Sequence, residues 1–367
     1  MTAPPFRADH VGSLLRPPAL RAARARRAAG EIAAAQLAKT EDAEIEKVVW
    51  RQESIGLRVA TDGEFRRYSW NTDFLANLDG AETVEVPLPL PDGRVATYRA
   101  PRIAGKVGFT HHPMIGHFAF LAGIAKATPK LSIPSPSMMI SLLRDWRVSV
   151  SEAAYPDRDA FCRDLAAAYK AAVGAFAASG CRYLQLDDCN LAYLCDPAHC
   201  EKIRARGDDP KAMLDLFIAM TNEAIAGRPA GMVVSTHICR GNFRSTWLAQ
   251  GGYEPVAEAM FNRMDVDAFF LEYDSERAGG FEPLRFVPKG KQIVLGLVTT
   301  KAEAREPKDL LKRRIDQAAK YVDIGQLCLS PQCGFASTEE GNIVAEDAQW
   351  AKLALVVETA REVWGEA

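Results

Sequence analysis

Four side chains that can bind a metal ion follow three predicted strands in the C-terminal half of the sequence. His237 and Cys239 lie in VVSTHICRGN, Glu272 lies in AFFLEYDS, and Cys333 lies in CLSPQCGFAS. One imidazole, two thiolates and one carboxylate make a complete tetrahedral shell of ligand types that zinc accepts. Because residues i and i+2 of an extended strand point to the same side, His237 and Cys239 can reach one ion. The sequence therefore predicts a zinc site.

A zinc ion held by thiolates and one weaker carboxylate is suited to activating a thiol. It can accept an incoming thiol, lower its pKa from the usual value of about 8.5, and present the sulfur as a nucleophile at neutral pH. Glu272 is the ligand that we expect the thiol to displace. A purely structural zinc is the main alternative, but structural sites usually have closed, cysteine-rich shells whose ligands are close in sequence.

Acidic residues end two other predicted strands. Glu64 ends the second strand in ATDGEFRR, and Asp187 and Asp188 end the fourth in YLQLDD. The first predicted strand ends at Gly12 and Ser13, where a glycine turn exposes backbone N–H groups that can hold a carboxylate. Acids for an ammonium group and N–H donors for a carboxylate are what an amino acid requires. We interpret these residues as substrate-binding, and we predict that Glu64 and Asp187 are also catalytic and hold the ammonium group. Each acid taken singly could instead belong to a structural ion pair.

Short strand-like runs alternate with helical segments along the chain. Helical spacing or Asp-Pro and Gly boundary signals mark helices at 42–56, 157–180, 209–227, 307–322 and 345–365. Eight apolar runs are expected to be strands: 8–13, 58–64, 130–135, 183–188, 232–238, 268–273, 292–300 and 326–331. Eight strands with helical returns predict an α/β fold, a (β/α)8 TIM barrel. Active sites of such barrels form at the C-terminal ends of the strands, where the predicted ligands fall.

The stretch from about 65 to 129 interrupts this alternation. It contains TVEVPLPLPDGRVATYRAPRIAGKV, in which Pro-Asp-Gly separates two alternating runs. We therefore predict a β-hairpin inserted after the second strand and covering the barrel mouth. No sequence repeat or Gly/Ser linker marks a second domain, so we expect residues 1–367 to form one barrel domain.

Composition limits the class of partner. The 367 residues are 48% hydrophobic and 25% charged, with a formal net charge of −2. This balance is typical of a soluble globular protein and gives no electrostatic case for nucleic acid or an anionic membrane surface. The N-terminus lacks a secretion-signal pattern, and no apolar run approaches the roughly 18 residues of a membrane span. We expect a cytoplasmic protein with mostly reduced cysteines.

A second group of metal-ligand types crowds the loop after the fourth predicted strand. Its members are Cys189, Cys195, His199 and Cys200. Their spacing fits no common zinc pattern well, so we do not expect a second metal there.

Taken in order, these segments resemble the catalytic C-terminal barrel of cobalamin-independent methionine synthase. The Val-Gly-Ser turn ending at Ser13 is similar to its homocysteine-binding turn. Gly63-Glu64-Phe65 is similar to the segment whose glutamate holds the substrate amino group, and Gln185-Leu186-Asp187-Asp188 to its Gln-hydrophobic-Asp-acid segment. The four predicted metal ligands are similar to the zinc ligands of that family. The resemblance implies a zinc-dependent methyltransferase that methylates homocysteine in methionine biosynthesis.

Two departures from the family bear on the methyl donor. The full-length family enzymes carry an additional N-terminal barrel, for which 367 residues leave no room. The family also has an Asp-x-His pair after the seventh strand, whose His is thought to assist the folate leaving group, whereas this chain has Thr299-Thr300-Lys301. Lys301 is our candidate for that general acid, which would need a lowered pKa. The donor stays open among methyltetrahydrofolate, a methylated corrinoid, a methyl-carrier protein, another methyl compound and an epoxide.

Other functions also stay open at this point. An epoxyalkane:coenzyme M transferase uses the same zinc to attack an epoxide with a thiol, but its sulfonate thiol would need a cation such as Arg16 or Arg240. A non-catalytic amino-acid or thiol-binding barrel would have the pocket without turnover. A barrel of the uroporphyrinogen decarboxylase type would need no metal. The oligomeric state is open as well.

Overall fold

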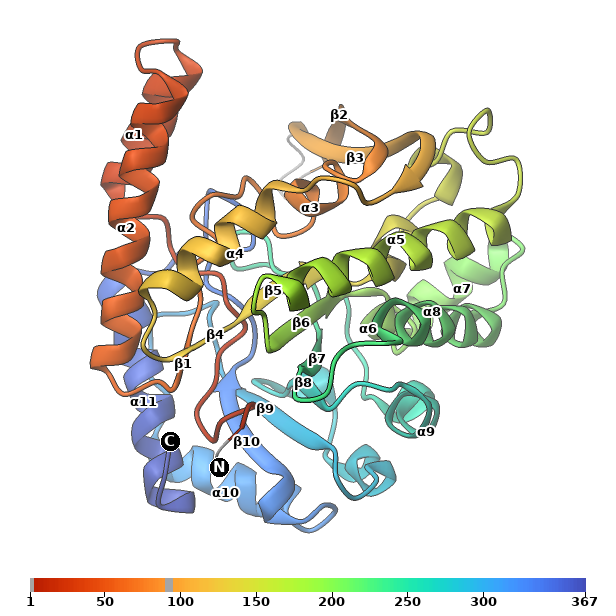
Figure 1. The fold of residues 1–367 in the computed structure, drawn as a ribbon. Coiled ribbons are helices and arrows are strands. Elements are labelled where there is room, and N and C mark those ends of the chain that lie inside the picture. Colours follow the sequence, from red (N-terminus) through yellow and green to blue (C-terminus); the bar gives the residue numbers. More distant parts are fainter. Residues whose placement is uncertain (1–2, 90–94) are drawn as a thin grey trace.

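A parallel sheet surrounded by helices forms the centre of the protein in this computed structural model, which describes residues 3–89 and 95–367 (Figure 1). Six parallel strands lie in the order β10-β9-β8-β7-β6-β5. Their bounds are Leu131–Pro134 (β5), Tyr183–Asp188 (β6), Val233–Ile238 (β7), Ala268–Glu272 (β8), Gln292–Val298 (β9) and Leu327–Pro331 (β10). These segments are almost entirely buried, as expected for parallel strands covered on both faces. The predicted α/β class is confirmed.

Two short parallel strands extend the ring beyond β5. They are β1 (Val59–Ala60) and β4 (Thr128–Pro129), which pair with each other. The chain passes from β4 directly into β5, and the Lys130 N–H donates to the carbonyl of Ala60 at 2.9 Å. Seven of the eight predicted strand regions therefore contain strands, and they follow one another in sequence order around the core.

The prediction of a regular strand at 8–13 was wrong. This segment makes a single bridge, from Ala8 to Leu329 of β10. Side chains rather than a neighbouring strand bond its next carbonyls. Lys130 Nζ donates to the carbonyl of His10 at 2.6 Å, Gln185 Nε2 to that of Val11 at 2.8 Å, and Thr61 Oγ1 to that of Gly12 at 2.7 Å. The regular ladder is thus not closed, and the extended segment occupies the gap between β10 and β1.

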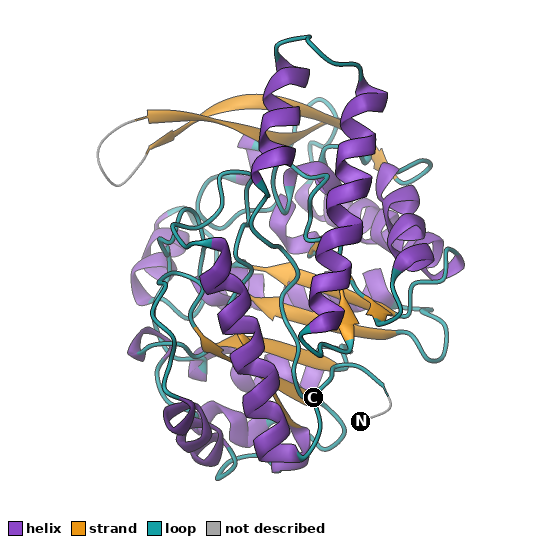
Figure 2. Ribbon diagram, turned by 90° about the vertical axis from the view of Figure 1, so that its left-hand side faces the viewer, coloured by secondary structure: helices purple, strands orange, loops and turns teal. Residues whose placement is uncertain are grey.

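The helices ring the sheet, as Figures 1 and 2 show from two sides. Their bounds are Pro18–Ala28 (α1), Ala34–Ser54 (α2), Thr72–Leu75 (α3), Pro113–Ile124 (α4), Arg158–Ala178 (α5), Asn190–Tyr193 (α6), Pro197–Ala205 (α7), Pro210–Ile225 (α8), Glu254–Arg263 (α9), Lys308–Ala318 (α10) and Glu346–Trp364 (α11). The Asp157 and Asp209 side chains accept backbone N–H bonds at the first turns of α5 and α8, which explains why those boundaries could be read from the sequence. Within the described ranges, no helix is long and apolar enough to cross a membrane.

The predicted hairpin is confirmed by strands β2 (Asp79–Pro89) and β3 (Val95–Gly108), which pair antiparallel. Its Pro-Asp-Gly turn lies outside the described residues. The hairpin projects from one end of the molecule (Figure 2). The hydroxyl of Tyr98 in β3 attaches it to the loop after β1, through contacts with Ser69 Oγ at 2.9 Å and Asn71 Oδ1 at 2.8 Å.

A buried ion pair lies inside the ring of strands. Lys130 Nζ and Asp9 Oδ1 are 3.0 Å apart, and both side chains are fully buried. The hydroxyl of Tyr183 donates to Asp9 Oδ2 at 2.9 Å, and Lys130 Nζ lies 4.0 Å from the ring centre of Phe270. The pair therefore links the extended N-terminal segment to the interior faces of β6 and β8.

Replacing Lys130 by Met should lower the free energy of unfolding by about 3–5 kcal/mol, because it leaves the Asp9 carboxylate buried without a counter-ion. Urea denaturation followed by circular dichroism measures this loss. Lys170→Met is the matched control, since the pair of Lys170 with Glu223 is about half exposed and should contribute at most about 1 kcal/mol. Equal losses in the two variants would contradict the importance of the buried pair.

Candidate metal centre and thiol cavity

The four predicted metal ligands converge from the ends of three parallel strands. His237 lies in β7 and Glu272 ends β8, while Cys239 and Cys333 lie just beyond β7 and β10. Their donor atoms all lie within 4.8 Å of one another, and all four residues are buried. In the β7–β8 register His237 pairs with Phe270, so Glu272 stands two residues further toward the same end of the sheet. Strand direction and register therefore bring together residues that are far apart in sequence.

The geometry of these side chains fits a tetrahedral ion. The sulfur atoms of Cys239 and Cys333 are 3.5 Å apart. Two sulfurs bound to zinc at about 2.3 Å with a tetrahedral angle are about 3.8 Å apart, whereas a disulfide would bring them to about 2.05 Å. Neither ring nitrogen of His237 has an oxygen or nitrogen partner within the described part of the chain. Buried polar atoms are normally satisfied, and a cation at this point would satisfy the imidazole.

The two thiols need a cation in order to ionise. Contact with the Cys189 thiol, together with burial, raises the pKa of Cys239 well above its ordinary value. Contact with Cys239 and burial have the same effect on the pKa of Cys333. Only the thiolate binds a metal, so a bound divalent cation would reverse both shifts.

One carboxylate oxygen of Glu272 is fixed by the backbone. Its Oε1 accepts the N–H of Arg240 at 2.7 Å, while its Oε2 is 3.9 Å from the nearest guanidinium nitrogen of Arg277. A carboxylate held by one firm hydrogen bond and one long ion pair keeps an oxygen for weak metal binding. This arrangement suits a ligand that can be displaced.

A cavity of about 410 Å³ opens beside the metal-ligand cluster. His237, Cys239 and Cys333 form part of its wall, and Glu64 and Asp187 form another part. The rest of the wall includes Val11, Ser13, Trp70, Tyr98, Cys189, Tyr193, Gly241, Asn242, Phe243, Thr246, Leu248, Gly334, Ser337 and Thr338. Three of the metal ligands and the two acids thus share one cavity.

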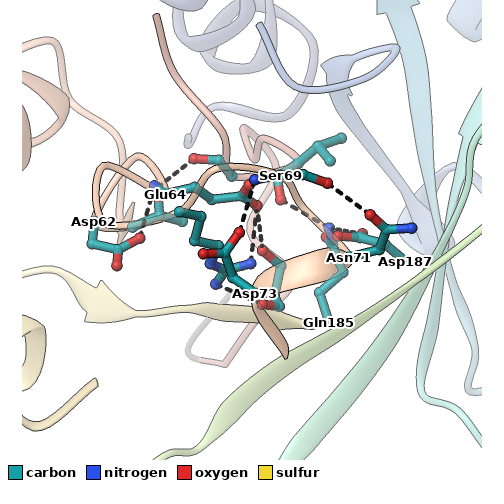
Figure 3. Close-up of polar contacts among 12 residues, drawn as sticks. Asp62, Glu64, Ser69, Asn71, Asp73, Gln185 and Asp187 are labelled. Atoms are coloured by element: carbon teal, nitrogen blue, oxygen red, sulfur yellow. Dashed lines mark hydrogen bonds and ion pairs between the residues drawn. The ribbon is translucent and has the colours of Figure 1, made fainter. Parts of the chain in front are cut away.

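Glu64 reaches the cavity from an unusual backbone turn after β1. Gly63 and Glu64 have φ angles of 64° and 61°, two successive left-handed residues. A left-handed non-glycine residue is strained, and such residues gather at functional sites. Glu64 Oε1 accepts the hydroxyl of Ser132 at 3.0 Å and lies 3.4 Å from Arg67 Nη1. Its Oε2 is buried and accepts from no described residue, so this oxygen is available to an ammonium group (Figure 3).

Asp187 extends from the end of β6 and is held by Gln185, whose Nε2 donates to its Oδ1 at 2.7 Å (Figure 3). Burial, followed by the negative charge of Glu64, raises the pKa of Asp187 to about 8. At pH 7 Asp187 therefore keeps its proton in most molecules. An ammonium group placed beside the two acids would favour loss of that proton.

The turn at Gly12 and Ser13 leaves its N–H groups free. No described residue accepts a hydrogen bond from either N–H. Ser13 is also in close contact with Gly334, where an added Cβ would lie 1.9 Å from Ser13 Oγ. The glycine at 334 therefore allows the turn to approach the metal-ligand cluster.

Four of the predicted site residues are not part of the cavity wall: Gly12, Asp188, Glu272 and Lys301. Asp188 Oδ2 accepts the hydroxyls of Ser135 and Ser137, and its Oδ1 accepts the N–H of Leu191 at 2.8 Å. These bonds fix loops behind the site. Lys301 also lies outside the cavity wall, with its Nζ buried and without a hydrogen-bond partner among residues 3–89 and 95–367.

The arginines that could have held a sulfonate are likewise outside the wall. Arg16 donates to the carbonyls of Leu14 at 3.0 Å and Ala336 at 2.8 Å. The guanidinium of Arg240 is stacked 4.6 Å from the ring centre of Tyr253. Arg16 is therefore engaged in the scaffold, whereas the guanidinium nitrogens of Arg240 are buried without a hydrogen-bond partner among the described residues.

Cys189 lines the cavity, although the sequence did not predict it. The β6–β7 register pairs Asp188 with Ile238, so Cys189 follows directly beside Cys239. The other metal-ligand types of the loop after β6 do not gather around Cys189. Backbone carbonyls accept hydrogen bonds from them instead: Cys195, His199 and Cys200. The aromatic wall residues Tyr98, Tyr193 and Phe243 come from the hairpin, from helix α6 and from the loop after β7, and no local pattern marked them.

The sequence profile of one family, described as "Cobalamin-independent synthase, Catalytic domain", matches residues 6–362. YxjH and YxjG, two uncharacterized proteins of Bacillus subtilis (strain 168), are each 49% identical to this chain, over 98% of its length and 95% of theirs. The 5-methyltetrahydropteroyltriglutamate–homocysteine methyltransferase of Chelativorans sp. (strain BNC1) is 24% identical over 98% of this chain. That match covers only 42% of the methyltransferase.

Solved structures show the same fold. A putative vitamin-B12 independent methionine synthase from Listeria monocytogenes is 39% identical, with a TM-score of 0.80 and full coverage of both chains. A B12-independent methionine synthase from Shewanella sp. W3-18-1, in complex with selenomethionine, has a TM-score of 0.75 at 18% identity and covers 98% and 97% of the two chains. The sheet and helices described above therefore have the arrangement of these synthase barrels.

Cys333→Ser should weaken zinc binding by more than about 100-fold, because even groups outside the ligand shell contribute 10- to 100-fold. The measurement is zinc content by mass spectrometry, with affinity from competition against a chelator. Wild-type protein is expected to hold about one zinc per chain. Cys328→Ser is the matched control, since Cys328 is a buried thiol of β10 outside the metal-ligand cluster. A metal-free wild type, or equal effects of the two substitutions, would refute the site.

The raised pKa of Asp187 makes a prediction about pH. The unfolded chain releases this proton near pH 3.8, whereas the folded protein keeps it until about pH 8. Between these values the folded state binds more protons, so Asp187 lowers stability as the pH rises. Asp187→Asn removes that loss. Its unfolding free energy relative to wild type should therefore increase between pH 5.5 and pH 8.5, as measured by urea denaturation in the presence of a chelator. The exposed Asp316→Asn should show no such change, and a pH-independent effect at Asp187 would contradict the shift.

Proposed function

The chain belongs to the cobalamin-independent synthase catalytic-domain family, and we propose that it is a zinc-dependent S-methyltransferase acting on homocysteine. The observation that supports this proposal is the sharing of one cavity by two kinds of group. The His237, Cys239 and Cys333 side chains can hold a metal at one part of the wall, and Glu64 and Asp187 form an acid pair at another. A small amino acid with a terminal thiol needs both.

His237, Cys239, Cys333 and, more weakly, Glu272 would hold the zinc. When bound, zinc lowers the pKa of a substrate thiol and so provides a sulfur nucleophile at neutral pH. The long contact of Glu272 Oε2 with Arg277, 3.9 Å, is the feature that would let this carboxylate give way to the thiol.

The amino-acid end of homocysteine would lie between Glu64, Asp187 and the Ser13 turn. The free Oε2 of Glu64 accepts one ammonium N–H, and Asp187 accepts another after losing its proton. The unbonded N–H groups of Gly12 and Ser13 receive the carboxylate. Fixing both ends of the substrate leaves its sulfur with one orientation, and such positioning accounts for a large part of catalysis.

Methyl transfer follows from this arrangement. The substrate sulfur attacks the methyl carbon of a second substrate in the open part of the cavity, and the product is methionine. The apolar side chains of Val11, Trp70 and Phe243 in the wall limit water around the reacting sulfur. The named activity of the Chelativorans relative, a homocysteine methyltransferase, is consistent with this reaction.

The acid pair favours homocysteine over coenzyme M. Coenzyme M has a sulfonate and no ammonium, and among the described residues the cavity wall contains no lysine or arginine to receive the sulfonate. A sulfonate beside Glu64 would be repelled. A thiol-binding protein without turnover has the same pocket, so only a product assay separates it from the enzyme.

Glu64→Gln should raise the Kd for homocysteine at least tenfold, because a charge-assisted hydrogen bond contributes about 1.5–3 kcal/mol. Isothermal titration calorimetry of the zinc-loaded protein measures this. The comparison ligand is 4-mercaptobutanoate, which keeps the thiol and carboxylate of homocysteine but lacks the amine. Its affinity should change less than threefold.

If Glu64→Gln lowered the affinity for homocysteine and for 4-mercaptobutanoate equally, Glu64 would not be the residue that binds the ammonium group. A zinc-loaded wild type that binds neither ligand would refute the proposed function. Methionine formed from homocysteine and a methyl donor, detected by mass spectrometry, would distinguish an enzyme from a binding protein.

A further inference from the structure

The charged side chains in the cavity wall include two acids, and Arg67, the cation 3.4 Å from Glu64, is not a wall residue. Glu64 and Asp187 line the cavity, and no lysine or arginine from the described ranges does so. A zinc ion of charge +2 held by the thiolates of Cys239 and Cys333 would have one net negative charge once the substrate thiolate is added. A second substrate entering beside them meets a field that attracts cations and repels anions.

Aromatic rings form the uncharged part of the wall. They are Trp70, Tyr98, Tyr193 and Phe243. The backbone N–H of Trp70 donates to the carbonyl of Ser337 at 2.8 Å, and the Tyr98 hydroxyl donates to Asn71 Oδ1 at 2.8 Å. The backbone of Trp70 and the ring of Tyr98 are therefore anchored before any ligand arrives. Aromatic faces within about 6 Å attract cations by about 0.5–2 kcal/mol, and methylated ammonium ligands are commonly bound this way. The wall is therefore suited to a methylated cation.

Apart from the proposed zinc ligands and the two acids, the described wall residues offer a neutral leaving group only hydroxyls and the Cys189 thiol, which are weak acids at neutral pH. A methyl group on a neutral amine leaves readily only if the amine is protonated, which requires a general acid. Lys301, the residue predicted for that task, does not line the cavity. In the proposed function Glu64 and Asp187 are carboxylates bound to the substrate ammonium. A sulfonium already carries positive charge and needs no proton to leave.

We infer that the methyl donor at this site is a methylsulfonium compound, an inference that rests on the proposed methylation of homocysteine. The step is balanced. The substrate thiolate sulfur forms a bond to the methyl carbon, and the bond between that carbon and the donor sulfur breaks. Its electron pair stays on the donor, which leaves as a neutral thioether. The proton of the substrate thiol has already passed to solvent.

The test uses zinc-loaded protein, homocysteine and fully deuterated trimethylsulfonium as the probe. Mass spectrometry should detect methionine carrying three deuterium atoms. The rate should be at least tenfold above the rates with 5-methyltetrahydrofolate and its triglutamate form. Tetramethylammonium, an unreactive cation of similar shape, should bind the zinc-loaded protein in calorimetry, whereas neutral tert-butanol should not.

Substitutions in the aromatic wall locate the donor. Trp70→Leu and Phe243→Leu should each weaken tetramethylammonium binding and slow transfer from trimethylsulfonium about tenfold, with homocysteine affinity unchanged. Trp247→Leu is the control, because Trp247 is 45% exposed and outside the cavity wall, and it should change the rate less than twofold.

The outcomes separate the two proposals. Methionine formed from methyltetrahydrofolate but not from the sulfonium would overturn the donor inference and leave homocysteine methylation standing. Homocysteine binding without transfer from any of these donors would also overturn the donor inference. Failure to bind homocysteine would refute the proposed function itself, and the donor inference with it.

Discussion

The buried ion pair between Lys130 and Asp9 is the interaction on which the geometry of the cavity depends. The extended segment 8–13 has only one bridge to a neighbouring strand, yet Ser13 at its end lines the cavity. Lys130 Nζ bonds both Asp9 and the carbonyl of His10, which holds the segment inside the ring. Because both charges are fully buried, neither can leave the other without a large desolvation cost. Buried polar side chains thus hold segment 8–13 in place, as backbone hydrogen bonds hold the regular strands.

Much of the fold could be predicted because its elements are encoded locally. The apolar runs of β6 to β10 and the Asp caps of α5 and α8 lie within the segments they define. The segment 8–13 has a strand-like sequence as well, but Thr61, Lys130 and Gln185 bond its carbonyls. Those partners are distant in sequence, so no local pattern could separate this segment from a true strand.

The metal ligands could be predicted because strand geometry alone brings them together. His237 and Cys239 share a side, and parallel direction brings Glu272 and Cys333 to them. The same alternation also explains why Asp187 lines the cavity while Asp188 bonds Ser135 and Ser137 behind it. The sequence predicts that Asp187, which lines the cavity, holds the ammonium group, but it also predicts a substrate-binding role for Asp188, which does not line it. The aromatic cavity residues Tyr98 and Phe243 could not be predicted from the sequence, since they come from elements whose position is set by tertiary contacts.

Tyr98 is the contribution of the β2–β3 hairpin to the cavity. The residues proposed to bind zinc and homocysteine all lie outside this hairpin, on the barrel segments and the loops that follow them. Mutations in β2 or β3 can therefore change the part of the cavity wall at Tyr98 without changing the residues proposed to bind zinc and homocysteine. In evolutionary terms, the insertion is a module on which selection for a new alkyl donor can act alone. Relatives with closely similar barrels could then diverge in donor preference, and overall identity would be a poor guide to that preference.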